Sequence, residues 1–328
     1  MSSPSLTMAE MPSPHSTAFS RKLPGMQTAW DSTSIGRLKT CPRKYYYSMI
    51  RGIAPRRQND HLTFGLLLHS ALEVYEKHRV TLPHDEAQER MVDWTLRESW
   101  EWKSETAEKT RKTLLRSIVW FTDKFNPDPL KTMILSDGRP ATELSFQIPL
   151  SSHVKTTDEE LILCGHIDRM VLLDGRPYAN DKKTTKGQLG NKFFSTFSPN
   201  NQMSLYIFAG QVAFAVELQG MIIDGIQVGV GFTRFERQLV SRDKFQINEW
   251  YQGLKSWLQQ AEMFALLGNH LQQSGQAIEN AWPQNDTACD HYGGCEFRSL
   301  CSKTPGARER EIGLAFSPSL WNPLTPRT

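Results

Sequence analysis

The chain has 328 residues, of which 39% are hydrophobic and 22% are charged, as in an ordinary soluble protein with one large domain or two moderate ones. The formal net charge of +3 neither requires nor excludes a nucleic-acid partner, because phosphate binding depends on where the cations cluster. No apolar run approaches the ~18 residues of a membrane span, and the N-terminus lacks the pattern of a secretory signal. We therefore expect no membrane association, a cytoplasmic location and reduced cysteines.

The N-terminal third is predicted to be helical after a disordered leader. Residues 1–29 are rich in Ser, Pro and Thr, which is typical of disorder. A helical part is expected over 30–130, opening with a short helix capped by Ser32 or Ser34. Apolar residues at helical spacing, including Leu62, Leu66, Leu68, Leu72 and Tyr75, then predict further helices over about 61–79, 85–102 and 105–125.

A sheet core is expected over 140–267, because the pattern there changes to alternating polar and apolar residues. The Asp174-Gly175 pair predicts a tight turn between two strands. Ser198-Pro199 predicts the start of a helix, and Asp224-Gly225 predicts a break between later strands. The strands are placed near 143–150, 161–173, 177–184 and 222–235, and the helices near 198–216 and 242–267.

Two carboxylates and a lysine are expected to converge on this sheet. Asp181 and Lys183 alternate with Lys182 along a strand and so share one face, while the hairpin brings Asp168 onto the neighbouring strand. Such a group suits a divalent metal that activates water and neutralises phosphate charge, with the lysine orienting that water or stabilising the transition state. Alone, the pattern is more often that of solvated charges at strand ends.

The ordered set of motifs resembles the RecB-type branch of the PD-(D/E)XK nuclease superfamily over roughly residues 34–301. The matching segments are Phe64-Gly-Leu-Leu-Leu-His69-Ser-Ala-Leu-Glu73, Glu143 in a short strand, Gly165-His-Ile-Asp168-Arg, Asp181-Lys-Lys183-Thr184 and Gln202-Met-Ser-Leu-Tyr206. The resemblance implies an α/β fold with a restriction-endonuclease-like core, in which a mixed central sheet is flanked by helices. It also implies a single nuclease domain over 30–303.

The resemblance further implies a role for each motif residue. Asp168, Asp181 and Lys183 would be catalytic, and His69, Asp168 and Asp181 would bind Mg²⁺ or Mn²⁺. A lone histidine on a leucine-rich helix is otherwise more often a structural residue. Supporting or DNA-binding roles fall to four further residues: Glu73 as a partner of His69, and Glu143, Gln202 and Tyr206.

Four of the five cysteines form a ligand set of the right number for a tetrahedral metal or an iron–sulfur cluster. They are Cys41 and, within a cysteine segment over 283–303, Cys289, Cys295 and Cys301. The fifth, Cys164, is interpreted as a buried core thiol. The split arrangement is similar to the 4Fe–4S staple of RecB-type nucleases such as the AddB subunits and the CRISPR spacer-acquisition nucleases. Structural Zn²⁺, unrelated free thiols, and His291 in place of Cys289 stay open as alternatives.

The resemblance implies a metal-dependent DNA nuclease of a bacterial or phage-infected cell. We expect an exonuclease acting on single-stranded or duplex DNA ends during recombination, repair or phage DNA processing. Because the chain lacks a GxxxxGK[ST] motif, a helicase or recombination protein would be a separate partner. The alternatives are an integration-associated end-trimming nuclease, an inactive DNA-binding or assembly subunit, and a zinc-stabilised binding module. Residues 304–328 are expected to form a flexible tail.

Overall fold

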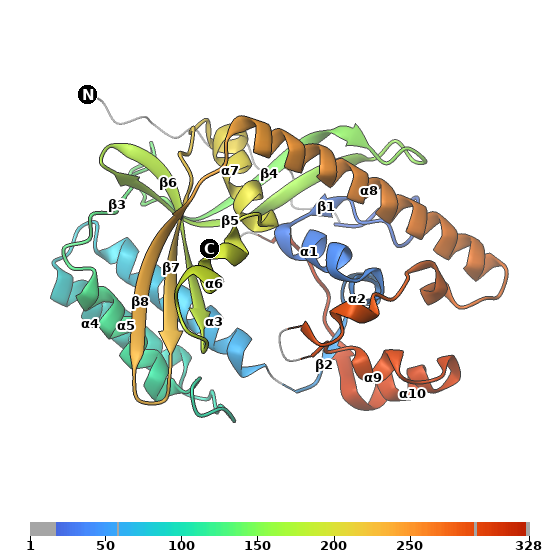
Figure 1. Cartoon of the computed structure of the whole chain (residues 1–328), viewed down its shortest axis with the longest axis horizontal. Helices are drawn as coiled ribbons and strands as arrows, with labels where there is room; N and C mark the ends of the chain where they lie inside the picture. Colours follow the sequence, from blue (N-terminus) through green and yellow to red (C-terminus); the bar gives the residue numbers. More distant parts are fainter. Residues whose placement is uncertain (1–17, 58, 292–293, 326–328) are drawn as a thin grey trace.

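The computed structural model describes residues 18–57, 59–291 and 294–325. Its centre is a seven-stranded mixed sheet with the order β1-β5-β6-β7-β8, in which β3 and β4 also pair with β5 (Figure 1). The expected α/β class, a mixed sheet flanked by helices, is confirmed. The strands are β1 (Ala29–Trp30), β3 (Lys131–Thr132), β4 (Thr142–His153), β5 (Glu160–Leu173), β6 (Arg176–Thr185), β7 (Met221–Val228) and β8 (Thr233–Val240).

The strands β5 and β6 separate part-way along their length, and this fork determines where the functional site lies. They pair as an antiparallel hairpin from Arg169↔Asn180 to Leu173↔Arg176, around the predicted turn. Beyond Asn180, β6 pairs with the parallel strand β7 alone, while β5 pairs with β4 and, at Ile162 and Leu163, with β1. Strand pairing thus leaves β5 and β6 without hydrogen bonds to each other just beyond Arg169 and Asn180.

Three helices cover one side of the sheet, grouped at the lower left of Figure 1. They are α3 (Asp60–His78), α4 (His84–Glu98) and α5 (Arg111–Lys124). Phe64 and Leu68 of α3 are fully buried and belong to a core shared with Ile226 of β7. Leu62 and Leu66, which we expected to be core positions, are 62% and 54% exposed. The buried face of α3 is therefore narrower than the number of leucines in the helix suggests.

The helix α7 (Asn201–Phe214) provides the crossover from β6 to the parallel β7. The helix start predicted at Ser198-Pro199 is wrong: Asn200 caps the helix by accepting from the amides of Gln202 and Met203. The peptide bond from Ser198 to Pro199 is cis and lies outside the helix. The other elements between β6 and the late cysteines are α6 (Asn191–Phe194), η2 (Ser195–Phe197), α8 (Lys244–Gln273), η3 (Ile278–Ala281) and η4 (Asp286–Ala288).

The first helices lie beside the C-terminal elements at the right of Figure 1. The N-terminal elements are α1 (Ser32–Thr40), α2 (Pro42–Tyr45), η1 (Tyr46–Ile50) and β2 (Ile53–Pro55). The C-terminal elements are α9 (Arg298–Cys301), α10 (Pro305–Ala315) and β9 (Phe316–Pro318). Asp31, rather than Ser32 or Ser34, caps α1, and the Ser34 hydroxyl completes the capping box. Instead of a flexible tail, 305–318 form α10 and β9, because β9 pairs with β2 and Arg308 is buried against Glu279.

Two further predictions differ from the structure. The predicted break at Asp224-Gly225 is wrong, since β7 runs through both residues. A side chain on Gly225 would meet Leu189 and Phe193 of the segment that covers β7, so this glycine permits close packing and makes no turn. Of the predicted leader, 1–17 lie outside the described residues, whereas Ala18 is buried. No helix in the described ranges is long and apolar enough to cross a bilayer.

Candidate functional site

The predicted carboxylates stand on the two arms of the fork. Asp168 lies on β5 immediately before the first residue that pairs with β6, and Asp181 follows Asn180 on β6. Both are buried, at 8% and 1% exposure. The geometry therefore brings together the residues that the hairpin pattern predicted, in the part of the sheet where β5 and β6 are no longer paired with each other.

His69 reaches this fork from α3. Its Nε2–H donates to the backbone carbonyl of Lys182 at 2.6 Å, and its Nδ1 lies 2.9 Å from Oδ2 of Asp168. A carbonyl oxygen can only accept, so the hydrogen bond to Lys182 fixes which ring nitrogen faces the carboxylate. Histidines that ligate metals are oriented in this way, with one nitrogen held by a carbonyl and the other free for the ion.

Lys183 is held between β6 and α7. Its Nζ lies 2.8 Å from Oδ2 of Asp181 and donates to Oε1 of Gln202, also at 2.8 Å. The amide of Gln202 in turn donates to the hydroxyl of Tyr206 at 3.1 Å. Because Gln202 and Tyr206 stand four residues apart on α7, one helix face orients the ammonium group.

The electrostatics of the site are those of two buried carboxylates with different partners. Burial raises the pKa of Asp181 to about 6, and the nearby Asp168 adds to this, against the opposing effect of Lys183. Burial also opposes ionisation of Asp168, but His69 and Lys183 hold its pKa well below the ordinary value. Burial acts to lower the pKa of His69, but the charge of Asp168, the hydrogen bond to it and the charge of Asp181 together outweigh burial, so that pKa is raised.

Glu143 lies next to the fork, whereas Glu73 contacts a residue of its own helix. Thr142 and Leu144 pair with Arg169 and Ile167, so Glu143 lies opposite Asp168 on the neighbouring strand. Its φ of 47° is in the left-handed region, which costs a non-glycine residue about 1 kcal/mol and is common at functional sites. Glu73 contacts Lys77 at 2.5 Å, whereas His69 takes its partners from β5 and β6.

Three residues that sequence reasoning did not single out lie directly behind the site. Lys182 and Arg169, each next to a predicted catalytic aspartate, are 2% and 7% exposed. Both contact Oε1 of Glu76 on α3, at 2.7 and 3.2 Å. Glu76 follows His69 by seven residues, two helical turns, and this spacing is the sequence signal that could have identified it.

The four predicted ligand cysteines line one cavity between the two ends of the chain. Cys41 is buried at the N-terminus of α2, and Cys289, Cys295 and Cys301 are partly exposed. The amide of Asn285 donates to Sγ of Cys41 at 3.4 Å, a contact expected of a thiolate that serves as a ligand. Cys164 is a buried thiol elsewhere, as predicted, at 1% exposure.

Neither the fork nor the cysteine cavity has side chains already arranged to bind a metal ion. Across 18–57, 59–291 and 294–325, no group of three or more His, Cys, Asp or Glu side chains could hold a metal ion as it stands. At the fork the reason is visible, because His69 and Lys183 occupy the carboxylates of Asp168 and Asp181. A cation there would replace these two contacts.

The family model that matches this chain is that of the PD-(D/E)XK nuclease superfamily, over residues 32–302. The chain belongs to this superfamily. The match contains both arms of the fork, the helices α3 and α7, and all four cysteines that line the cavity. No curated protein sequence matches this nuclease.

Two solved structures are similar to this nuclease at low identity. One, described as a proposed exonuclease from Eubacterium rectale, is 10% identical, with a TM-score of 0.45 over 72% of this chain and 81% of its own. The other, SSO0001, is 13% identical, with a TM-score of 0.33 over 84% of this chain and 87% of its own.

Nucleases of this superfamily generally use divalent metals, and the residues at the fork fit such a group. Asp168 and Asp181 supply buried carboxylate oxygens, which Mg²⁺ and Mn²⁺ prefer, and His69 supplies an imidazole nitrogen beside them. Burial of the Asp181 carboxylate, which Lys183 compensates only in part, is unfavourable without a cation, and the raised pKa of Asp181 is a sign of this.

Proposed function

We propose that this nuclease is a Mg²⁺- or Mn²⁺-dependent deoxyribonuclease that hydrolyses phosphodiester bonds at DNA ends. The observation that carries the proposal is the fork, where the Asp168–His69 pair and the Asp181–Lys183–Gln202 chain meet in one buried site. We place its activity in recombination, repair or phage DNA processing, in the cytoplasm.

Asp168, Asp181 and Nδ1 of His69 would hold the metal. When bound, the ion lowers the pKa of a coordinated water and neutralises charge on the scissile phosphate. The chain itself orients these ligands. The Lys182 carbonyl keeps Nδ1 of His69 turned toward the carboxylate of Asp168 before any cation arrives, so binding requires little rearrangement of the ring.

Lys183 would stabilise the negative charge that develops on the phosphate oxygens. Its ammonium group is partly exposed, with 27% of the side chain accessible, whereas the carboxylate of Asp181 is almost fully buried. The Gln202 amide holds the ammonium from the side of α7. A cation fixed in this way stabilises the transition state without having to reorganise during the reaction.

The experiment is a cleavage assay on end-labelled single-stranded and duplex DNA, with Mg²⁺, Mn²⁺ or EDTA. We expect release of nucleotides from labelled ends by the wild-type protein only with metal, no release by Asp168→Ala, and release slowed by about 10²–10³-fold by Lys183→Ala. Covalently closed circular DNA tests the requirement for an end and should stay intact. Cleavage that both substitutions leave unchanged would overturn the mechanism, and metal-independent DNA binding without any cleavage would favour the inactive-subunit alternative.

We also propose that Cys41, Cys289, Cys295 and Cys301 hold a 4Fe–4S cluster. Their shared cavity and the amide contact to Cys41 support this. The cluster would link α2 to the segment before α10 and have no role in the hydrolysis.

Protein purified without oxygen tests this assignment. We expect a brown colour with broad visible absorption, and iron and sulfide in equal amounts. The buried but remote Cys164 provides the matched control, because Cys164→Ala should keep the colour that Cys41→Ser loses. A colourless preparation that contains stoichiometric Zn²⁺ would replace the cluster by the zinc alternative.

A further inference from the structure

A buried ionic cluster joins the two arms of the fork through the residues that follow Asp168 and Asp181. One oxygen, Oε1 of Glu76, contacts Nζ of Lys182 at 2.7 Å and Nη1 of Arg169 at 3.2 Å. All three side chains are less than 10% exposed. Arg169 also approaches Asp128 at 3.9 Å, and its Nη2 donates to the Leu130 carbonyl at 3.2 Å.

The two cations occupy equivalent positions on the two arms. Arg169 follows Asp168 on β5, and Lys182 follows Asp181 on β6. Neighbouring residues of a strand point to opposite faces, so each cation sits behind the carboxylate that precedes it. Beyond the Arg169↔Asn180 pair no backbone hydrogen bond joins β5 to β6, and Glu76 supplies a link between them where that pairing ends.

The same helix carries the imidazole of the site. His69 and Glu76 both belong to α3 and stand two turns apart, so both address the fork from one side of the helix. His69 binds the backbone of Lys182, while Glu76 binds the side chain of that residue. Lys182 is therefore held at two points by α3, and through it so is the neighbouring Asp181.

We propose that Glu76 is a positioning residue that fixes the spacing of Asp168 and Asp181 by clamping Arg169 and Lys182 from behind. The inference rests on the proposed function, because it assigns Glu76 to the metal site of the fork. Stability alone is a poor explanation for such a cluster, since well-packed apolar residues often replace buried ion pairs without loss. What apolar residues cannot supply is a directional contact that joins both arms to one atom.

The test is the dissociation constant of Mn²⁺ alone, measured by calorimetry on the full chain for Glu76→Gln and Lys182→Met. Loss of an oriented partner behind metal ligands typically weakens metal binding by about 10–100-fold, and we expect this range for both variants. Lys182→Met leaves Glu76 paired with Arg169, so neither of these buried charges loses its last partner and the fold should be retained.

The sign of the Lys182→Met effect separates positioning from simple electrostatics. Removal of a positive charge close to a cation site should strengthen Mn²⁺ binding if charge alone matters. Positioning predicts weaker binding instead. Unchanged or tighter binding by Lys182→Met, with the fold intact by circular dichroism, overturns the proposal even if Glu76→Gln fails to fold.

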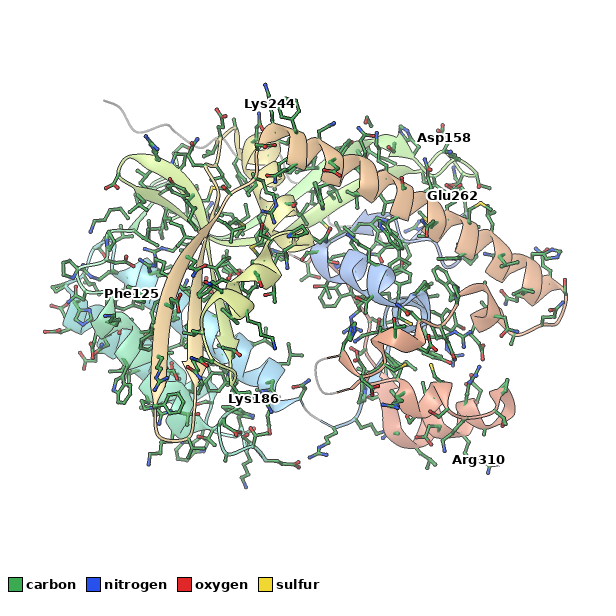
Figure 2. The ribbon with its side chains drawn as sticks, in the orientation of Figure 1. Phe125, Asp158, Lys186, Lys244, Glu262 and Arg310 are labelled. Atoms are coloured by element: carbon green, nitrogen blue, oxygen red, sulfur yellow. The ribbon has the colours of Figure 1, made fainter. Side chains whose placement is uncertain are left out.

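Glu262 provides a matched control. It is another buried glutamate, 6% exposed, whose carboxylate accepts from Thr156. Figure 2 shows it on α8, on the opposite side of the molecule from Phe125 at the end of α5. Glu262→Gln should bind Mn²⁺ as the wild-type protein does. If the wild type binds Mn²⁺ at the fork but cleaves no DNA, the proposed function fails while the clamp remains testable by affinity.

Discussion

The fork and the cysteine cavity are built in opposite ways from the same chain. Asp168 and Asp181 belong to one hairpin, and each already has a protein partner that holds its carboxylate. The cavity joins the two ends of the chain, since the contact from Asn285 to Cys41 spans 244 residues. Its thiols have few polar partners among the described residues, and burial raises the pKa of Cys295 and Cys301.

This difference implies different responses to loss of the bound group. The fork is organised by strand pairing, by α3 and by α7, so it should keep its geometry when metal is removed. The cavity is lined by cysteines from segments far apart in the chain, so the attachment of these segments should depend more on a bound cluster. The following predictions, from the largest expected effect to the smallest, test that contrast.

Cys295→Ser should have the largest effect on stability. It should lose the visible absorption and lower the free energy of unfolding by on the order of 4 kcal/mol, the scale of releasing a loop of more than 100 residues. Denaturant unfolding under anaerobic conditions measures it, with Cys164→Ala as the control that keeps the absorption. Equal stability of Cys295→Ser and the wild type would show that the cavity needs no cluster.

Lys183→Met should act on the rate and leave the fold intact. Removal of one oriented charge from a transition state typically lowers the rate by about 10²–10³-fold. Mn²⁺ affinity should be unchanged or higher, because a positive charge next to Asp181 is lost. Single-turnover cleavage and calorimetry measure the two quantities. A fall in affinity that accounts for the whole loss of rate would make Lys183 a structural residue.

Asp181→Asn should stabilise the metal-free protein while removing metal binding. The folded-state pKa of about 6 lies above the ordinary 3.8, so the folded state binds more protons between these values. Stability conferred by the protonated form is therefore lost as pH rises through this window, and above pH 6 the ionised carboxylate costs roughly 3 kcal/mol.

Thermal unfolding at pH 7.5 in EDTA should accordingly give a higher midpoint for Asp181→Asn than for the wild type. Excess Mn²⁺ should reverse the order, because only the wild type gains from binding. A variant less stable than the wild type under both conditions would contradict an unfavourable carboxylate at the fork.

Lys109→Met should have the smallest effect on stability and should leave the fork and the cysteine cavity unchanged. Lys109 is 2% exposed and lies over the Phe64 ring, and burial lowers its pKa to about 8 from 10.5. The unfolded state binds more protons between pH 8 and 10.5, so stability should rise with pH across that window. At pH 7 the substitution should stabilise the protein by roughly 1–2 kcal/mol, and its pH dependence should flatten. Chemical denaturation from pH 7 to 10 measures both.

The local parts of the site could be predicted from the sequence. The turn at Asp174-Gly175 places Asp168 opposite Asp181, and strand alternation puts Lys183 on the same face. The spacing of four residues between Gln202 and Tyr206 predicts their shared helix face. These inferences depend on neighbours within about twenty residues, where periodicity and turn chemistry are strong signals.

Long-range choices could not be predicted in the same way. Glu73 and Glu76 both lie on α3 near His69, and only the packing of α3 on the sheet selects Glu76 as the partner of Arg169, 93 residues away. Asp224-Gly225 is predicted to be a turn because a glycine in the sequence can indicate either a turn or close packing, and here it permits close packing. The helix α10 was missed because its attachment relies on the pairing of β9 with β2, at the other end of the chain.

The central claim is that His69 and the two carboxylates of the fork hold the ion that cleaves DNA. The most direct measurement is the cleavage rate of end-labelled DNA against Mn²⁺ concentration for the wild type, His69→Ala and Asp181→Asn. We predict no cleavage in EDTA, a requirement of His69→Ala for about 10–100-fold more Mn²⁺, and no cleavage by Asp181→Asn at any concentration. Superimposable metal titrations for the three proteins would contradict the account.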